Sequence, residues 1–244
     1  GMSAMARHHV IACHVLWREI CYHASLSPNV FDFTFLPQGL HNTPEKLRDQ
    51  VQAAIDDCVD DSEAILLGYG LCSNGLAGIV ARDKPLVIAR AHDCITHLLG
   101  SKERYREYFD KHPGTYWYSP GWIDSSTMPG KERYERLRAQ YGEKYGEENA
   151  EYLMEMEQGW FKRYSNAAYV DLGAQETGQY KRDTQEAADW LGWKYDELEG
   201  DPALIVAFLN GDWDDDRFII VQPGQVITPS HDEGVLTIEP PPTL

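Results

Sequence analysis

Two short apolar runs set close together constrain the fold of this chain more than any other feature. Residues 64–67 (AILL) and 86–89 (LVIA) are all aliphatic, and polar residues follow each run at once. Such runs are typical of strands buried on both faces, as in a parallel sheet. About 20 residues separate them, a length that suits a crossover between parallel strands. We therefore expect both strands in one sheet, with their carboxyl ends at the same edge.

The rest of the chain alternates between strand and helix patterns. Further strands are expected at residues 8–14, 31–36, 115–118, 167–171, 193–198 and 218–222. Helices are expected at residues 44–59, 95–111, 183–191 and 202–210. This alternation predicts an α/β fold with three layers, α/β/α, around a largely parallel, Rossmann-like sheet.

The length of the chain allows a sizeable core, since 43% of its 244 residues are hydrophobic. We expect a single α/β domain over residues 2–227, either as one body or as two lobes. Residues 131–163 are highly charged and predict a helical insertion, as one helix or as two helices broken near Gly142 or Gly146. Residues 228–244 are expected to form a proline-rich C-terminal tail.

The charge balance excludes several classes of partner. With 39 acidic and 22 basic residues the net charge is −17, which repels nucleic-acid phosphates and anionic lipid. No apolar run reaches the roughly 20 residues of a membrane span, and residues 8–16 are too short and too polar for a secretion signal. We therefore expect a cytoplasmic protein without nucleic-acid or membrane partners. Its five cysteines should be free thiols or metal ligands.

The first chemically informative segment, GYGLCSNG at residues 68–75, follows the first apolar run. It is not a dinucleotide fingerprint, because Ser73 stands where the third glycine would fall. One interpretation is a tight turn whose glycines serve the backbone. The other is a turn that also presents Cys72 at a helix N-terminus, where the helix dipole favours the thiolate. The candidate ligand-binding residues in this segment are Gly68, Gly70 and Asn74.

The second informative segment, RAHDC at residues 90–94, follows the second run. His92 and Cys94 can share a face, because extended residues two apart point the same way. Imidazole and thiolate are both good zinc ligands. Alternatively, His92 and Asp93 cap the following helix and Cys94 is a core residue. Arg90 is a further candidate for ligand binding.

The two segments leave the same predicted sheet edge, so we expect Cys72, His92 and Cys94 to converge on one zinc site. Cys13, near the end of the first strand, would lie close by as a further ligand. Without a cation such a group of charges would repel, so either a metal is bound or a thiol stays protonated. A Cys72–Cys94 redox pair is a weaker alternative, because the C-x-x-C spacing is absent. The candidate general acids and bases are Glu19, Asp93 and Asp171.

Several other histidines and cysteines are not expected to form part of a functional site. Cys58 falls on the apolar face of the helix expected at 44–59, which predicts a core residue. His97 follows Cys94 by three residues and is expected to be exposed. The pair at His8 and His9 has no spacing that indicates a site.

Several segments together resemble a known family. They are residues 12–13 (AC), 67–75 (LGYGLCSNG), 90–100 (RAHDCITHLLG), 113–122 (PGTYWYSPGW), 169–173 (YVDLG) and 211–224 (GDWDDDRFIIVQPG). They resemble the uncharacterised prokaryotic family called domain of unknown function 1638. Proteins similar to this one often occur beside corrinoid-dependent methyltransferase systems, so the resemblance implies a corrinoid protein as a partner. The residues that match the family's motifs are Cys13, Cys72, His92, Asp93 and Cys94.

Two classes of function follow from these observations. In the first, a zinc–thiolate enzyme acts on a small-molecule substrate, by methyl transfer to a thiol or by lysis of a small amine or acid. In the second, the chain is a non-catalytic module. It binds a small ligand or a corrinoid protein, and its cysteines are packing residues.

Overall fold

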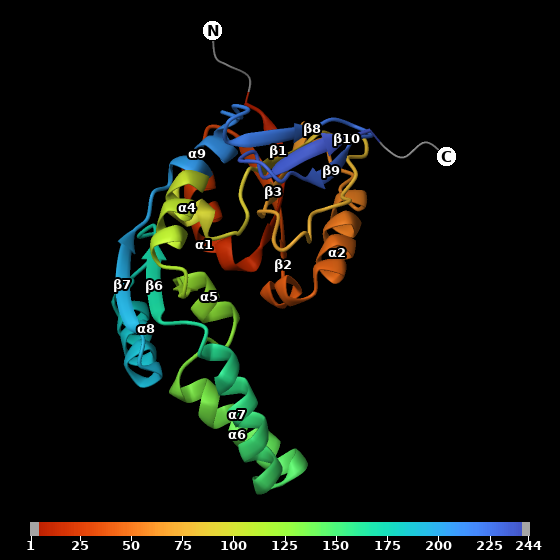
Figure 1. Cartoon of the computed structure of the whole chain (residues 1–244). Coiled ribbons are helices and arrows are strands. Elements are labelled where there is room, and N and C mark those ends of the chain that lie inside the picture. The colour runs from red at the N-terminus through yellow and green to blue at the C-terminus, as the bar shows by residue number, and fades with distance from the viewer. Residues whose placement is uncertain (1–4, 241–244) are drawn as a thin grey trace. The chain divides into compact units, whose positions relative to one another are not determined.

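The computed structural model describes residues 5–240, and the chain divides into two compact units (Figure 1). Unit 1 contains the residues up to 105 and from 200 onward, and unit 2 is Arg106–Glu199. Unit 2 is therefore inserted between two parts of unit 1 in the sequence. In the described part of the chain, no helix combines the length and the apolar character of a membrane span.

Unit 1 is built around a five-stranded sheet. Its strands are β1 Arg7–Cys13, β2 Val30–Leu36, β3 Ala64–Gly68, β4 Leu86–Ala89 and β8 Phe218–Val221. The strand order is β2-β1-β3-β4-β8, and only the pairing of β8 with β4 is antiparallel. Every residue of β3 and β4 is buried, as their aliphatic sequences predict. The prediction of an α/β protein with a mostly parallel sheet is confirmed.

Helices lie on both sides of this sheet, with α1 and α9 on one side and α2 on the other (Figure 1). The helical elements are η1 His14–Leu16, α1 Trp17–Leu26, η2 Gln38–Asn42, α2 Pro44–Asp56, α3 Thr96–Leu99, α4 Lys102–Lys111 and α9 Ala203–Asn210. The expected single helix at 95–111 is wrong, because Gly100 separates α3 from α4. Gly100 adopts a left-handed conformation with φ 91°, which ends α3.

Residues 226–239 form a β-hairpin, although part of this segment was expected to be a tail. Its antiparallel strands are β9 Val226–Pro229 and β10 Leu236–Glu239. Arg90 ties the hairpin to the sheet. Its Nη1 donates to the carbonyls of Gly234 (3.1 Å) and Leu236 (2.7 Å), and its Nε donates to the carbonyls of Asp215 (2.6 Å) and Phe218 (3.2 Å). These contacts give Arg90 a structural role, and its expected role in ligand binding stays a prediction.

Replacing Arg90 with Met should therefore destabilise unit 1 by about 2 kcal/mol, because the part-buried carbonyls of Phe218, Gly234 and Leu236 lose a charged donor. Urea unfolding followed by circular dichroism would measure the change. Arg82→Met is the matched control. Its Nε pairs with Asp56 at 2.9 Å while both side chains stay about half exposed, so its loss should change stability by less than about 1 kcal/mol. Equal losses of stability in the two variants would show that Arg90 does not hold the hairpin to the sheet.

Unit 2 has a sheet and a core of its own. The parallel strands β5 Thr115–Tyr118, β6 Asn166–Asp171 and β7 Lys194–Glu199 lie in the order β5-β6-β7. Its helices are α5 Pro120–Ser125, α6 Lys131–Tyr145, α7 Glu147–Phe161 and α8 Gly178–Leu191. An aromatic core includes Tyr118, Phe161, Tyr169 and Trp193. Asp171, a candidate general acid or base, ends β6 in this second sheet and therefore does not lie in the five-stranded sheet that precedes Cys72.

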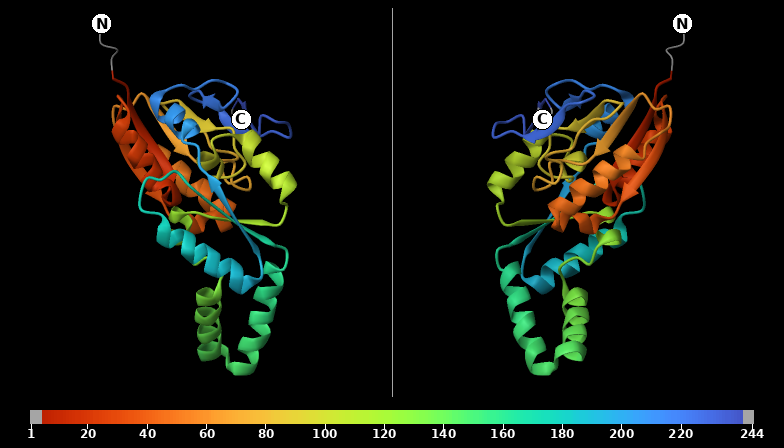
Figure 2. Two further views of the ribbon diagram at one scale, coloured as in Figure 1. Left: turned by 90° about the vertical axis from the view of Figure 1, so that its left-hand side faces the viewer. Right: turned by 90° about the vertical axis from the view of Figure 1, so that its right-hand side faces the viewer.

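The charged segment at 131–163 forms an antiparallel helical hairpin, α6 and α7, which lie side by side in Figure 2. Of the two predicted break points, the chain uses Gly146, whose φ is 87°. Within α7, Ala150, Met154 and Phe161 are buried, whereas α6 buries no residue completely. The hairpin therefore leaves much of its surface in solvent.

Candidate functional site

In the unit 1 sheet, the order in which strands are added reverses at β1: the strand that follows β1 lies on one side of it, and the strand after that lies on the other side. From β1 the chain moves through α1 to β2 on one side, and then through α2 to β3 on the other side. The loops after β1 and β3 consequently diverge to opposite sides. In open α/β sheets, ligands bind at such a point, outside the carboxyl ends of the strands.

Three cysteine thiols gather at this edge. Cys13 is the last residue of β1, Cys72 follows β3, and Cys94 follows β4. The sulfurs of Cys72 and Cys94 lie 3.6 Å apart, and Cys94 also hydrogen-bonds with Cys13. Cys13 and Cys94 are fully buried, Cys72 is 7% exposed, and all three are free thiols. The expected proximity of the Cys72 and Cys94 sulfurs is confirmed.

The electrostatics of this three-thiol cluster favour protonated sulfurs when no cation is present. Hydrogen bonds with Cys13 and Cys72, together with burial, raise the pKa of Cys94 well above that of an ordinary thiol. Burial and the three neighbouring thiols also raise the pKa of Tyr69, which is completely buried. A bound cation would reverse this preference, because it stabilises thiolates.

The loop that carries Cys72 has an unusual backbone. Cys72, Ser73 and Asn74 have φ values of 51°, 54° and 68°, in the left-handed region that costs a non-glycine residue about 1–2 kcal/mol. Backbone bonds to the other loop hold this conformation: Leu71 N–H donates to Ala91 O at 2.7 Å, and Cys72 N–H donates to His92 O at 3.0 Å. Strain of this kind concentrates at functional sites.

The glycines of the same loop allow two close backbone contacts. A Cβ at Gly68 would lie 2.5 Å from Ala12 Cβ, and one at Gly70 would lie 2.7 Å from Ala91 O. Packing therefore explains both glycines, as in the first of the two interpretations of this turn. Asn74 is exposed.

The RAHDC segment differs from expectation at its histidine. The His92 side chain is exposed. Within residues 5–240, neither His92 nor Cys13 completes with Cys72 and Cys94 a group of three ligand atoms that all lie within 4.8 Å of one another. Asp93 accepts a hydrogen bond from the Ile95 N–H at 3.1 Å, which stabilises the turn. The expectation of an exposed His97 is wrong. It is buried, its Nε2–H donates to Tyr69 O at 3.1 Å, and burial lowers its pKa.

Of the three candidate carboxylates, Glu19 is the strongest candidate for a proton-transfer group at this edge, because of its burial and its position. It is 1% exposed and lies in the first turn of α1, which begins shortly after Cys13. A carboxylate is rarely buried to this degree without a structural or functional reason. Asp171 lies in unit 2, where it accepts hydrogen bonds from the Tyr169 hydroxyl at 2.6 Å and the Gly173 N–H at 2.8 Å.

Comparison with known families identifies the group to which the chain belongs. Residues 35–209, well over half of the chain, match the family described as "Protein of unknown function (DUF1638)". The chain belongs to the DUF1638 family. The DUF1638 match includes Cys72 and Cys94 but leaves Cys13 and Glu19 outside it. No curated protein matches the chain, and neither does any solved structure.

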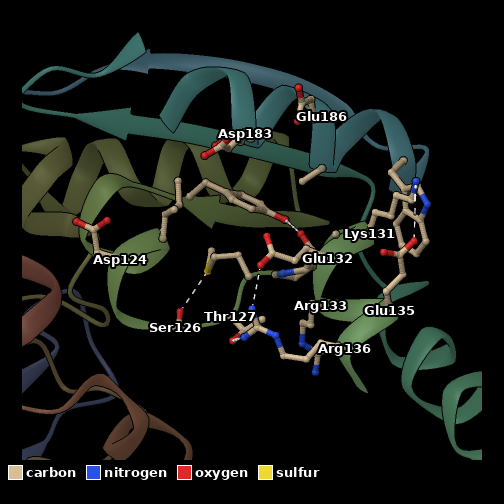
Figure 3. A pocket seen from close by; sticks show the side chains of 18 of the residues that line it. Asp124, Ser126, Thr127, Lys131, Glu132, Arg133, Glu135, Arg136, Asp183 and Glu186 are labelled. Carbon is tan, nitrogen blue, oxygen red and sulfur yellow. Dashed lines mark hydrogen bonds and ion pairs between the residues drawn. The ribbon is translucent and has the colours of Figure 1, made fainter. Parts of the chain in front are cut away.

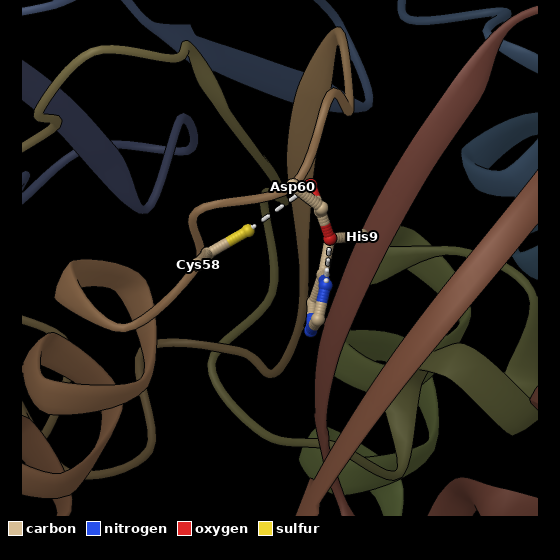
Figure 4. A group of neighbouring side chains, drawn as sticks. All are labelled: His9, Cys58 and Asp60. Carbon is tan, nitrogen blue, oxygen red and sulfur yellow. Dashed lines mark hydrogen bonds and ion pairs between the residues drawn. The ribbon is translucent and has the colours of Figure 1, made fainter.

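A second cluster lies toward the amino end of β1. His9, Cys58 and Asp60 bring ligand atoms within 4.8 Å of one another and could hold a metal (Figure 4). Cys58 is thus not the expected core residue, because α2 ends at Asp56 and Cys58 is half-buried in the loop that follows. His9 was assigned no role from the sequence. The DUF1638 match includes Cys58 and Asp60 but not His9.

Lys84 already supplies a positive charge to this second cluster. Its Nζ donates to Asp60 Oδ1 at 2.9 Å and to the Asp60 carbonyl, and it lies 3.9 Å from Cys58 Sγ. Burial alone would raise the pKa of Asp60, but hydrogen bonds from Ser62, His9 and Lys84 outweigh it and hold that pKa well below its usual range. A metal would have to displace Lys84, so we interpret the cluster as a structural ion-pair network.

Unit 2 of this DUF1638 protein contains an open groove of about 1130 Å³ between α5, α6 and α8 (Figure 3). Part of its charge is paired internally: Arg136 contacts Glu132 at 2.9 Å, and Lys131 contacts Glu135 at 3.9 Å. The described residues that line it include none of the candidate ligand-binding, metal or catalytic residues named from the sequence. The three-thiol cluster therefore remains the better candidate site.

Proposed function

We propose that this protein is an enzyme that uses zinc, held by Cys72 and Cys94 with Cys13 drawn in as a third ligand when the metal binds, to act on a small molecule. The observation that carries the proposal is the 3.6 Å separation of the Cys72 and Cys94 sulfurs. Two sulfurs on a tetrahedral zinc with bonds of about 2.3 Å lie about 3.8 Å apart. A disulfide would need about 2.05 Å. The observed separation thus fits two ligands of one metal ion.

The donor set favours a catalytic metal over a purely structural one. Three protein ligands leave a fourth position for water or substrate, as in catalytic zinc sites. Zinc would activate a thiol or polarise a substrate at that position. In this proposal Glu19 moves protons at the same edge, and the strained loop fixes the Cys72 sulfur.

The substrate class rests on the family resemblance. Methyl transfer to a thiol fits a thiolate–zinc site, and a corrinoid protein is the methyl donor that the resemblance implies. Lysis of a small amine or acid is the other reaction that fits. We further propose a cytoplasmic location, where the thiols stay reduced, and a three-layer, Rossmann-like unit 1.

A non-catalytic role is the second candidate, and the burial of the cysteines favours it. Cys13 and Cys94 are fully buried, and the raised pKa of Cys94 keeps its thiol protonated in the absence of a metal. Three hydrogen-bonded thiols can pack as small apolar groups. The chain would then bind a ligand or a corrinoid protein without catalysing a reaction.

Metal analysis separates these candidates. We expect about one zinc per chain, by mass spectrometry, in protein purified without a histidine tag and reconstituted with zinc under reducing conditions. Cys72→Ala should lose the metal, whereas the control Cys58→Ala should retain it. The reverse pattern would place the metal at His9, Cys58 and Asp60. A wild-type chain that binds no zinc would favour the non-catalytic role.

A further inference from the structure

Helix α7 carries an exposed hydrophobic stripe, made of Tyr152, Met156 and Trp160. Their side chains are 63%, 61% and 47% exposed, and their spacing of four residues places them on one face of the helix. The buried face of α7, which includes Met154, lies on the opposite side. A row of large exposed hydrophobic side chains on a soluble protein marks an interaction surface.

Gly159 lies next to this stripe and has no explanation within the chain. A glycine inside a helix costs about 1 kcal/mol relative to alanine. A Cβ at Gly159 would meet no atom within 4 Å, so intramolecular packing does not require its absence. A small residue here fits a second backbone that approaches the helix from outside.

The charges along this face differ between its two ends. Glu148 precedes the stripe and Arg163 follows it, and both are exposed. Neither forms an ion pair with any other residue in the described part of the chain. In an antiparallel pair of α7 helices centred on Met156, Tyr152 would face Trp160 of the other copy. Glu148 would then lie near the other copy's Arg163, so opposite charges meet at the two ends of the pair, while the exposed Glu155 of each copy lies beside the central Met156.

We propose that two copies of this chain associate through the exposed face of α7, with the two helices antiparallel. The arrangement is isologous, because each copy contributes the same stripe. Helix α7 has 15 residues and is therefore about 22 Å long. A contact between two helices of this length is a small interface, so the dimer should dissociate in the micromolar range.

Sedimentation equilibrium of the full chain between about 1 and 200 µM tests the proposal. The wild-type mass should rise from monomer toward dimer across this range. Met156→Arg should remain monomeric throughout, because the substitution places two like charges at the centre of the interface. Val59→Arg is the matched control, since Val59 is 91% exposed in unit 1 and should not affect the dimer. Circular dichroism would verify that all variants are folded.

A charge exchange tests the antiparallel orientation. Glu148→Arg and Arg163→Glu should each weaken the dimer, by about tenfold at moderate salt, whereas the double variant should restore it. A wild-type chain that stays monomeric at the highest concentration would overturn the proposal, as would a Met156→Arg variant that dimerises normally. A stripe that instead binds a different protein would also contradict it.

Discussion

Gly70→Ala is expected to destabilise unit 1 by about 3 kcal/mol and to separate the two loops of the three-thiol cluster. The added Cβ would lie 2.7 Å from Ala91 O and 2.8 Å from Asp93 N. Both are backbone atoms that cannot rotate away, so the loop itself must move. Cys72 lies two residues further along, and its sulfur should move away from Cys94.

Urea unfolding would give the loss of stability, and the rate of thiol labelling would report the exposure of Cys72 and Cys94. Gly39→Ala is the control, because its Cβ would meet no atom within 4 Å and its backbone suits alanine. This control should change stability by no more than about 1 kcal/mol. Normal stability of Gly70→Ala, with unchanged labelling, would contradict the prediction, because it would show that the loops accept the added Cβ without separating.

The metal-free protein is expected to lose stability as the pH rises above 9, because of Cys94. The pKa of Cys94 in the folded protein is raised above the ordinary thiol value of 9.0. Its contribution to stability is therefore complete below pH 9 and is lost as the pH rises toward the folded pKa. The loss is about 1.4 kcal/mol for each pH unit between the two pKa values.

Unfolding free energies at pH 8, 9, 10 and about 11 would measure this slope. The buried tyrosines also titrate at high pH, so the comparison is between the wild type and Cys94→Ala, which lacks this thiol. The difference between their free energies should change with pH, and bound zinc should abolish it, since a metal holds the thiolate form. Parallel pH profiles in the two metal-free proteins would contradict the raised pKa.

The sequence predicted the features of unit 1 that depend on local pattern. The aliphatic runs at residues 64–67 and 86–89 identified β3 and β4, because short runs made only of aliphatic residues are typical of strands buried on both faces. The position of each loop at a strand's carboxyl end then implied that Cys72 and Cys94 would meet. This inference needed only the parallel direction of two strands, and it did not depend on the rest of the fold.

The errors arose where the outcome depends on contacts between distant segments. Asp171 ends a strand as predicted, but nothing in its local sequence tells which of two sheets the strand joins. The His9 and Asp60 contact joins residues about 50 positions apart, and Lys84 completes it from a third segment. Gly100 was placed inside a helix because apolar residues at helical spacing, from Ile95 to Phe109, continue across it. Its left-handed conformation accompanies a close approach to Asp201, which the stripe cannot indicate.

The insertion of unit 2 has a consequence for the newly made chain during translation. Strand β4 is complete at Ala89, but its partner β8 begins only at Phe218. At about 5–20 residues per second, the ribosome needs roughly 6–25 s to synthesise the residues between Cys94 and Phe218. Throughout that interval the aliphatic β4 has an open edge, and such an edge can pair with other chains. The three cysteines are already present, so the half-built sheet has both an open strand edge and three free thiols until its last strand is made.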